Sequence, residues 1–136
     1  MIKFKVDRKE LIKILEKLKL NIDKKSTMPI LHTVCIDIFK DKLNLSTVNI
    51  EKGNCISLTI PIKDQIGELN INYNQWNSEI YGICPNIIML LKICKICSER
   101  YLQFEITNFN IKIISLGNWF DCNLGGIQAD DFPRSY

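Results

Sequence analysis

Apolar and polar residues alternate at the start of the chain and then change to a helical period. Residues 2–6 read Ile-Lys-Phe-Lys-Val, the period-two pattern of a half-buried strand. Asp7, with Glu10 three residues later, has the spacing of a helix capping box. The apolar residues that follow recur three and four positions apart, on one helix face: Leu11, Ile14, Leu15 and Leu18. The pattern predicts a strand followed directly by an amphipathic helix.

The same order of patterns returns later in the chain. Met28 precedes a proline and is therefore expected to be extended. Alternating runs then predict three strands, at residues 32–39, 42–48 and 55–60. From residue 80 a short strand leads to Cys84, and Pro85 suits the first turn of a more apolar helix. That helix and the three strands after it are predicted at residues 86–97, 101–107, 110–116 and 118–124.

The chain thus reads as two βαβββ units within one domain over residues 1–136, a length that suits a single domain. We expect an α+β fold in which two helices pack on antiparallel sheets. We assign residues 1–61 to the first unit and 80–126 to the second. Residues 62–79 are expected to be an exposed excursion that contains a short hairpin near residues 69–73, and residues 127–136 an irregular C-terminal segment.

Composition excludes several classes of protein. Hydrophobic residues make up 46% and charged residues 24% of the chain, which is ordinary globular usage and argues against intrinsic disorder. No run of ~18 apolar residues could cross a membrane, and the N-terminus lacks the apolar region of a signal peptide. We therefore expect a cytoplasmic protein without a membrane partner, and its six cysteines to be reduced thiols.

Charge is distributed unevenly. The chain carries a formal charge of +3, but residues 1–66 hold 13 Lys and Arg against 8 Asp and Glu, whereas residues 67–136 hold more acidic than basic groups. Lys9, Lys13 and Lys17 form a stripe on the first helix, opposite its apolar face. Such a stripe is either a solvated face or the footprint of a nucleic-acid binder. Because lysine is abundant throughout the chain, the stripe alone favours the solvated face.

The candidate chemical motifs are weak. Cys94 and Cys97 share a helix face, but a structural zinc site needs a second ligand pair, so we expect buried thiols. His32 has no catalytic constellation around it in the sequence, and Gly125-Gly126 lacks the pattern of a phosphate-binding loop. We expect no enzyme, catalytic residue, metal or cofactor. The aromatic residues are expected to pack rather than to stack on bases: Tyr73, Trp76, Tyr101, Phe109, Trp119 and Phe120.

Four short segments, taken in order, resemble one known family. They are residues 1–11 (MIKFKVDRKEL), 26–31 (STMPIL), 43–51 (LNLSTVNIE) and 129–133 (ADDFP). They are similar to the opening strand and helix, the Thr-x-Pro-Ile-Leu start of the second strand, the Thr-Asp-Leu-Glu strand end and the closing Phe-Pro of one domain. That domain is the first domain of the bacterial DNA sliding clamp, the β subunit of DNA polymerase III.

The resemblance implies a domain of two βαβββ units, in a family whose chains have three such domains and close as a head-to-tail ring around DNA. The ring tethers the polymerase and provides processivity in DNA replication. Implied partners are double-stranded DNA without sequence preference, further copies of the chain, and polymerase or clamp-loader subunits, in a bacterium or an organelle's replication compartment. The implied DNA-binding residues are Lys9, Lys13, Lys17, Lys24, Lys25, Lys92 and Lys95.

The chain departs from the family in several places. Asn49 replaces the usual aspartate, and residues 86–88 are uncharged where the family has a basic residue after the proline. The second and third domains, which carry the family's peptide pocket, do not occur in these residues. We therefore expect a clamp-like protein that self-associates, six single domains replacing two chains of three. The alternatives are an interaction protein that binds and regulates a replisome subunit through a sheet edge, or a relic fragment without independent DNA binding.

Overall fold

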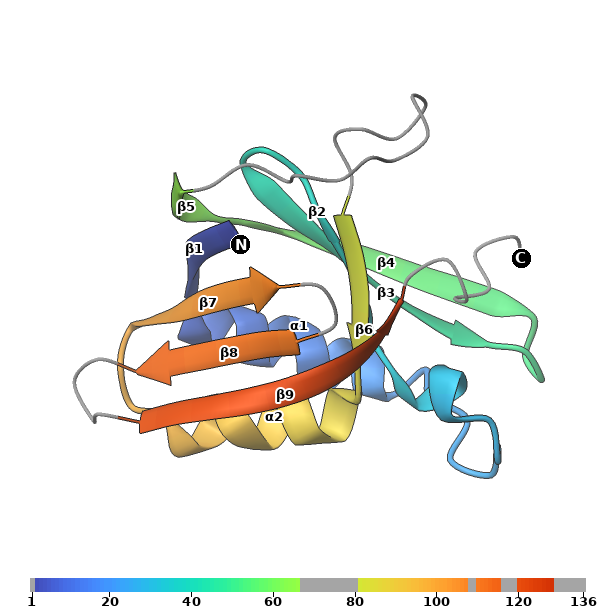
Figure 1. Cartoon of the computed structure of the whole chain (residues 1–136). Helices are drawn as coiled ribbons and strands as arrows, with labels where there is room; N and C mark the ends of the chain where they lie inside the picture. The colour runs from blue at the N-terminus through green and yellow to red at the C-terminus, as the bar shows by residue number, and fades with distance from the viewer. Residues whose placement is uncertain (1, 67–80, 108–109, 116–119, 129–136) are drawn as a thin grey trace.

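The computed structural model describes residues 2–66, 81–107, 110–115 and 120–128 (Figure 1). The hairpin predicted near residues 69–73 and the family-like segment 129–133 lie outside the described residues. So do five of the six aromatic side chains considered above; the exception is Tyr101, which is partly buried.

The order βαβββ occurs twice among the described residues, as predicted. The first unit contains β1 (Ile2–Asp7), α1 (Arg8–Lys19), a short 3-10 helix η1 (Pro29–His32), β2 (Cys35–Ile38), β3 (Lys42–Asn49) and β4 (Asn54–Pro61). The second contains β6 (Tyr81–Pro85), α2 (Ile87–Ile96), β7 (Tyr101–Thr107), β8 (Asn110–Ser115) and β9 (Phe120–Gln128). An additional strand, β5 (Lys63–Ile66), lies within the range that we expected to be an excursion.

Three local predictions were wrong in detail. Residues 29–32 form η1 rather than leading into a strand at residue 32, because Pro29 suits the first turn of a helix and the hydroxyl of Thr33 donates to the Ile30 carbonyl at 2.6 Å. Pro85 ends β6 instead of opening α2, whose N-cap is Asn86. The last strand, β9, continues to Gln128 instead of ending at residue 124, so residues 127 and 128 are paired in the sheet and not irregular as expected.

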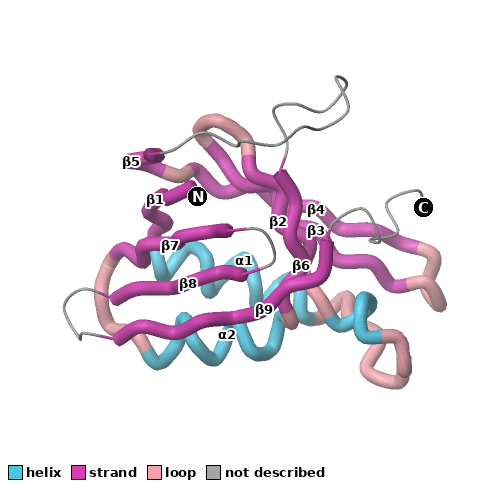
Figure 2. Tube along the Cα trace, in the orientation of Figure 1, coloured by secondary structure: helices cyan, strands magenta, loops and turns pink. Residues whose placement is uncertain are grey.

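The nine strands of the described residues form one antiparallel sheet in the order β4-β3-β2-β6-β9-β8-β7-β1-β5 (Figure 2). The two units exchange their first strands within this sheet. β1 pairs with β7 of the second unit, from Ile2↔Ile106 to Asp7↔Tyr101. β6 pairs with β2 of the first unit. Each unit therefore completes its sheet with a strand from the other, and the two units are interlocked.

Strand β9 joins the two parts of the sheet by changing partners along its length. Its residues from Phe120 to Gly125 pair with β8, whereas those from Gly126 to Gln128 pair with β6. At this change of partner, a Cβ on Gly126 would lie 2.5 Å from Cγ1 of the buried Ile83. Glycine thus allows the close approach of the two strands.

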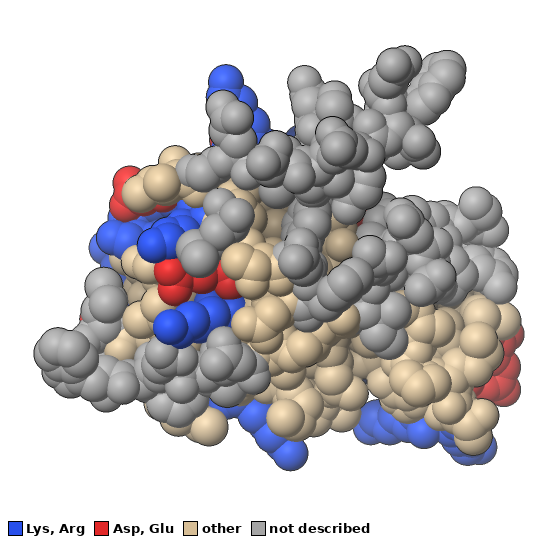
Figure 3. Space-filling view, in the orientation of Figure 1, with Lys and Arg blue, Asp and Glu red and all other residues tan. Residues whose placement is uncertain are grey.

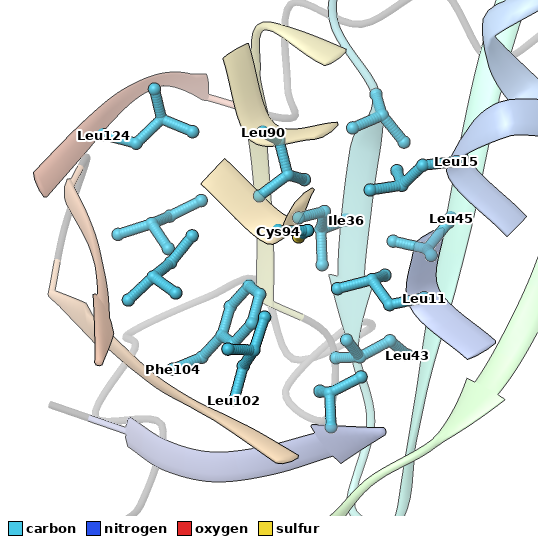
Figure 4. Packing of buried hydrophobic residues seen from close by; sticks show 14 of the residues in the cluster. Leu11, Leu15, Ile36, Leu43, Leu45, Leu90, Cys94, Leu102, Phe104 and Leu124 are labelled. Carbon is cyan, nitrogen blue, oxygen red and sulfur yellow. The ribbon is translucent and has the colours of Figure 1, made fainter. Parts of the chain in front are cut away.

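Both helices cover the same face of the sheet, and the core lies between them and the strands (Figures 1 and 4). Alternation in β1 places Phe4 on this inner face, where its ring stacks on that of Phe104 with centroids 5.5 Å apart. Leu11, Leu15 and Leu18 bury the predicted apolar face of α1. Neither described helix is long and apolar enough to cross a membrane.

A buried polar network fixes the end of α1 against β3. The amide nitrogen of Asn21 donates to the carbonyl and hydroxyl oxygens of Thr47, each at 3.3 Å. The Thr47 hydroxyl in turn donates to the Leu18 carbonyl at 3.3 Å. Asn21 and Thr47 are both buried. Because both side chains are buried, loss of the Thr47 hydroxyl would leave Asn21 without one acceptor and the Leu18 carbonyl without one donor, which makes the network sensitive to this loss.

We expect Thr47→Val to lower the free energy of unfolding by about 1–3 kcal/mol, because it keeps the side-chain shape but leaves the buried Asn21 amide short of an acceptor. Urea unfolding followed by circular dichroism measures this change. Thr59→Val, at an exposed position of β4, is the matched control and should change stability little. Equal effects of the two substitutions would contradict a structural role for the network.

Candidate nucleic-acid interface

The exposed side of α1 carries three lysines. Asp7 caps the helix, its Oδ1 accepting from the Glu10 backbone N–H at 3.0 Å, which confirms the predicted start. Lys9, Lys13 and Lys17 follow at intervals of four residues, so each is turned only ~40° from the one before. All three are exposed and lie opposite the buried leucines. The first helix therefore presents a narrow cationic stripe away from the sheet.

Two further lysines follow α1 in the loop that leads to η1. Lys24 and Lys25 are both exposed. The Lys25 backbone N–H donates to Oδ1 of Asp23 at 3.0 Å, which forms a local turn. His32 contacts the Ser26 carbonyl through Nε2 at 2.7 Å and so ties the far end of this loop to η1. The loop thus adds two cations beyond the end of the α1 stripe.

The second helix contributes less positive charge. Lys92 and Lys95 are exposed, but the Lys95 ammonium forms an ion pair with the carboxylate of Glu16 on α1. The outer side of α2 around Lys92 is otherwise apolar: Ile88, Met89 and Ile96 are 39%, 50% and 64% exposed. Only α1 therefore has the cationic outer side that the family resemblance implied for both helices.

The ion pair changes the titration of Glu16. The hydrogen bond from Lys95 lowers the pKa of the Glu16 carboxyl below 4.5, assisted by the positive charges of Lys95 and Lys19 and opposed by partial desolvation. A lowered folded-state pKa means that the pair stabilises the protein above pH 4.5. This contribution is lost as the pH falls through the lowered value.

A second contact between the helices was not predicted. Nε of Arg8, the first residue of α1, donates to the Glu99 carbonyl at 2.7 Å, and Nη1 donates to the Cys94 carbonyl at 3.4 Å. Arg8 thus binds the backbone at the end of α2, and its charge lies at the favourable end of that helix dipole. These partners are about ninety residues away in the sequence, and no local pattern could have identified them.

The two cysteines of α2 and its C-cap are buried, as predicted. Cys94 lies in the core, and Cys97 caps the helix. Burial raises the pKa of the Cys94 thiol to about 12, so this thiol stays protonated at neutral pH. None of the five cysteines whose side chains are described forms a disulfide: Cys35, Cys55, Cys84, Cys94 and Cys97.

All seven lysines proposed from sequence are exposed, and five of them lie on two helices that are side by side (Figure 1). The family described as "DNA polymerase III beta subunit, N-terminal domain" matches residues 2–136. No curated protein matches the chain in sequence.

Solved structures share the fold at low sequence identity. The DNA polymerase III subunit β of Pseudomonas aeruginosa has a TM-score of 0.79 and 16% identity over 98% of this chain. The pol III β of Caulobacter crescentus has a TM-score of 0.77 and 18% identity over 98% of this chain. The β clamp of Helicobacter pylori bound to a DNA ligase peptide has a TM-score of 0.75 and 18% identity over 98% of this chain. The alignments cover 32%, 32% and 33% of those chains, so this chain spans about a third of their length.

We expect Lys95→Met to raise the pKa of Glu16 towards 4.5, because it removes both the hydrogen bond and the nearest positive charge. NMR titration of the Glu16 carboxyl carbon measures the shift. Lys92→Met is the control, since it removes an exposed lysine from the same helix without touching this pair. A Glu16 pKa that stays low in the Lys95 variant would contradict the ion pair.

Proposed function

The chain belongs to the family of the N-terminal domain of the DNA polymerase III β subunit, and from this premise we propose that it is a clamp domain that binds double-stranded DNA without sequence preference. Family members are sliding clamps, which provide processivity in DNA replication and are not enzymes. The observation that carries the proposal is the exposed stripe of Lys9, Lys13 and Lys17 on α1. Lys24, Lys25 and Lys92 add to this charge, whereas Lys95 is held by Glu16.

Lysine stripes suit a protein that moves along DNA. Ammonium groups attract phosphates and release counterions, which gives affinity without reading the base sequence. Long, exposed lysine side chains do not fix one register on the backbone, because each can pass from one phosphate to the next. The three α1 lysines project from one side of the helix, so all three can face the DNA backbone together.

We propose that several copies of the domain together surround the duplex. One domain presents a single pair of helices and can cover only part of the circumference of DNA. The sheet ends in the edge strands β4 and β5, whose outer backbone groups are available for pairing with another chain. Contacts between unlike surfaces of successive copies would generate a ring where the rotation between them closes.

A triple substitution tests the DNA-binding face. We expect Lys13→Glu, Lys17→Glu and Lys25→Glu together to abolish binding to duplex DNA at low salt, because they replace attraction to phosphate by repulsion. Fluorescence anisotropy with labelled duplexes of unrelated sequence measures binding and its salt dependence.

The charge-matched control changes Lys40, Lys42 and Lys52, exposed residues outside the helices, to Glu. This variant should retain most of its affinity. Unaltered binding by the α1 and loop variant, or equal losses in the two variants, would overturn the assignment of the face.

A mass measurement tests the proposed ring independently. We expect analytical ultracentrifugation at high protein concentration to detect an oligomer. This oligomer should stay bound to nicked circular DNA and dissociate after the DNA is linearised, because a closed ring can slide off a free end. A monomer both with and without DNA would contradict the proposed ring. The DNA-binding assay above would still test the lysine face separately.

A second candidate function is favoured by the outer side of α2. Ile88, Met89 and Ile96 expose apolar surface where a DNA-facing helix would carry cations, and such surface is typical of a protein-binding site. In this alternative the domain binds and regulates a subunit of the replicative machinery. Binding of a purified polymerase or clamp-loader subunit that is lost in Met89→Lys/Ile96→Lys, together with absent DNA affinity at low salt, would favour it over the first proposal.

A further inference from the structure

The face of the sheet opposite the helices contains a groove at its β5 edge. Two cavities of about 190 Å³ and about 560 Å³ lie there, and both are lined by Lys5 and Gln103, so they adjoin. Lys5 belongs to β1 and Gln103 to β7, and both side chains point away from the core because their neighbours Phe4 and Phe104 point into it. We call the two cavities together the β5 groove.

One end of the β5 groove is cationic. Nζ of Lys63 lies 3.5 Å from the ring centroid of Tyr101, and Cζ of Arg100 lies 5.1 Å from it. Lys5 adds a third positive charge, and Glu99 supplies the one carboxylate that lines this smaller cavity. In Figure 3, basic side chains gather with fewer acidic ones at the left of this outer face. Nε of Arg100 also lies 3.9 Å from Oδ2 of Asp7, but among the residues that line this cavity three positive charges stand against the one of Glu99. Lys63 and Arg100 both lie against the ring of Tyr101.

The other end is formed by an irregularity in β5. The pairing of β1 with β5 changes register between Lys3↔Ile66 and Lys5↔Lys63, so β5 contains one extra residue. Asp64 lies in this bulge with a φ of 53°, a left-handed conformation that aspartate tolerates better than most residues, and its carboxylate contacts Lys5 at 3.6 Å. The bulge therefore sets the direction in which the next two side chains of β5 project.

Those two side chains provide an unused acceptor and an apolar surface. Oε1 of Gln65 is buried and has no hydrogen-bond partner among the described residues. A buried amide oxygen without a donor is costly. Because this oxygen is closed to solvent, a ligand N–H reaches it only after the Gln65 side chain rotates towards the groove. Ile66, which also lines the larger cavity, is 66% exposed. This end of the groove thus suits an apolar side chain next to a hydrogen-bond donor.

We propose that the β5 groove binds an extended segment of a partner protein that carries one acidic side chain close to an apolar one. The acidic group lies among Lys5, Lys63 and Arg100, a backbone N–H of the segment donates to Gln65, and the apolar side chain packs on Ile66. Because this face is opposite the helices, the segment and DNA bind at the same time.

Fluorescence anisotropy with a labelled synthetic peptide tests the proposal. The probe is a short chain of serine and threonine with a central glutamate and a leucine two positions away on either side. We expect saturable binding to the wild-type domain, and a loss of at least about tenfold in affinity for Lys63→Glu/Arg100→Glu, since two charge-assisted contacts become repulsive. Lys63→Gln/Arg100→Gln, which only neutralises the two charges, should give a smaller loss in the same direction.

Matched controls identify which feature of the peptide is recognised. Lys40→Glu/Lys52→Glu changes the net charge equally at exposed sites outside the groove and should leave the affinity unchanged. Peptides in which lysine replaces the glutamate, or serine the leucines, should bind weakly. Equal binding of the lysine peptide, equal binding of the serine peptide, or unchanged affinity of Lys63→Glu/Arg100→Glu would each overturn the proposal.

The two binding proposals can fail separately. The variant with Lys13, Lys17 and Lys25 changed to Glu should keep the affinity of the wild type for the peptide, because none of these residues lines the groove. Conversely, Lys63→Glu/Arg100→Glu should keep most of its affinity for DNA. Loss of peptide binding in the first variant would show that the peptide binds the helix face, and it would overturn the groove as the site.

Discussion

The exchange of first strands between the two units is the constraint on which the rest of this structure depends. β1 completes the sheet of the second unit by pairing with β7, and β6 completes that of the first by pairing with β2. Each helix directly follows an exchanged strand, so the position of α1 is set by the second unit and that of α2 by the first. The helices consequently lie side by side on one face, where Arg8 reaches the carbonyls at the end of α2 and Glu16 meets Lys95.

The local elements of this fold were predictable because they depend on neighbouring residues. Alternation identified β1, the spacing of Leu11, Leu15 and Leu18 identified the buried side of α1, and Asp7 marked its start. The exchange itself was not predictable from the pattern, because it depends on pairing between residues such as Asp7 and Tyr101. Pro85 shows the same difference. Its local preference suits the first turn of a helix, but strand pairing places it at the end of β6, and Asn86 caps α2 instead.

The same difference between local and distant contacts applies to the candidate sites. The exposure of Lys9, Lys13 and Lys17 follows from the helical period and could be predicted. The pairing of Lys95 with Glu16 could not, since it depends on how the two helices pack. The β5 groove was missed entirely because it combines β1, β5 and β7 with a bulge at Asp64 that no sequence pattern indicates. Because successive side chains of β1 point to opposite faces of the sheet, this one strand contributes Phe4 to the core and Lys5 to the groove.

The exchanged strands also determine the order in which this chain can fold. β1 is synthesised before its partner β7, which begins only at Tyr101, so all the residues between the two strands must be made before that pairing can form. Until then the apolar side of β1 lacks its packing partners from the second unit, and the edge of β1 that pairs with β7 has no partner. Pairing between residues so distant in sequence requires closing a long loop, and the entropy cost of closure comes before the contacts that offset it. Folding by such pairing is therefore slow and exposes intermediates that aggregate. Lys3 and Lys5 alternate with the apolar residues of β1 and keep one face of this strand charged before β7 has formed. A charged strand resists pairing with other chains.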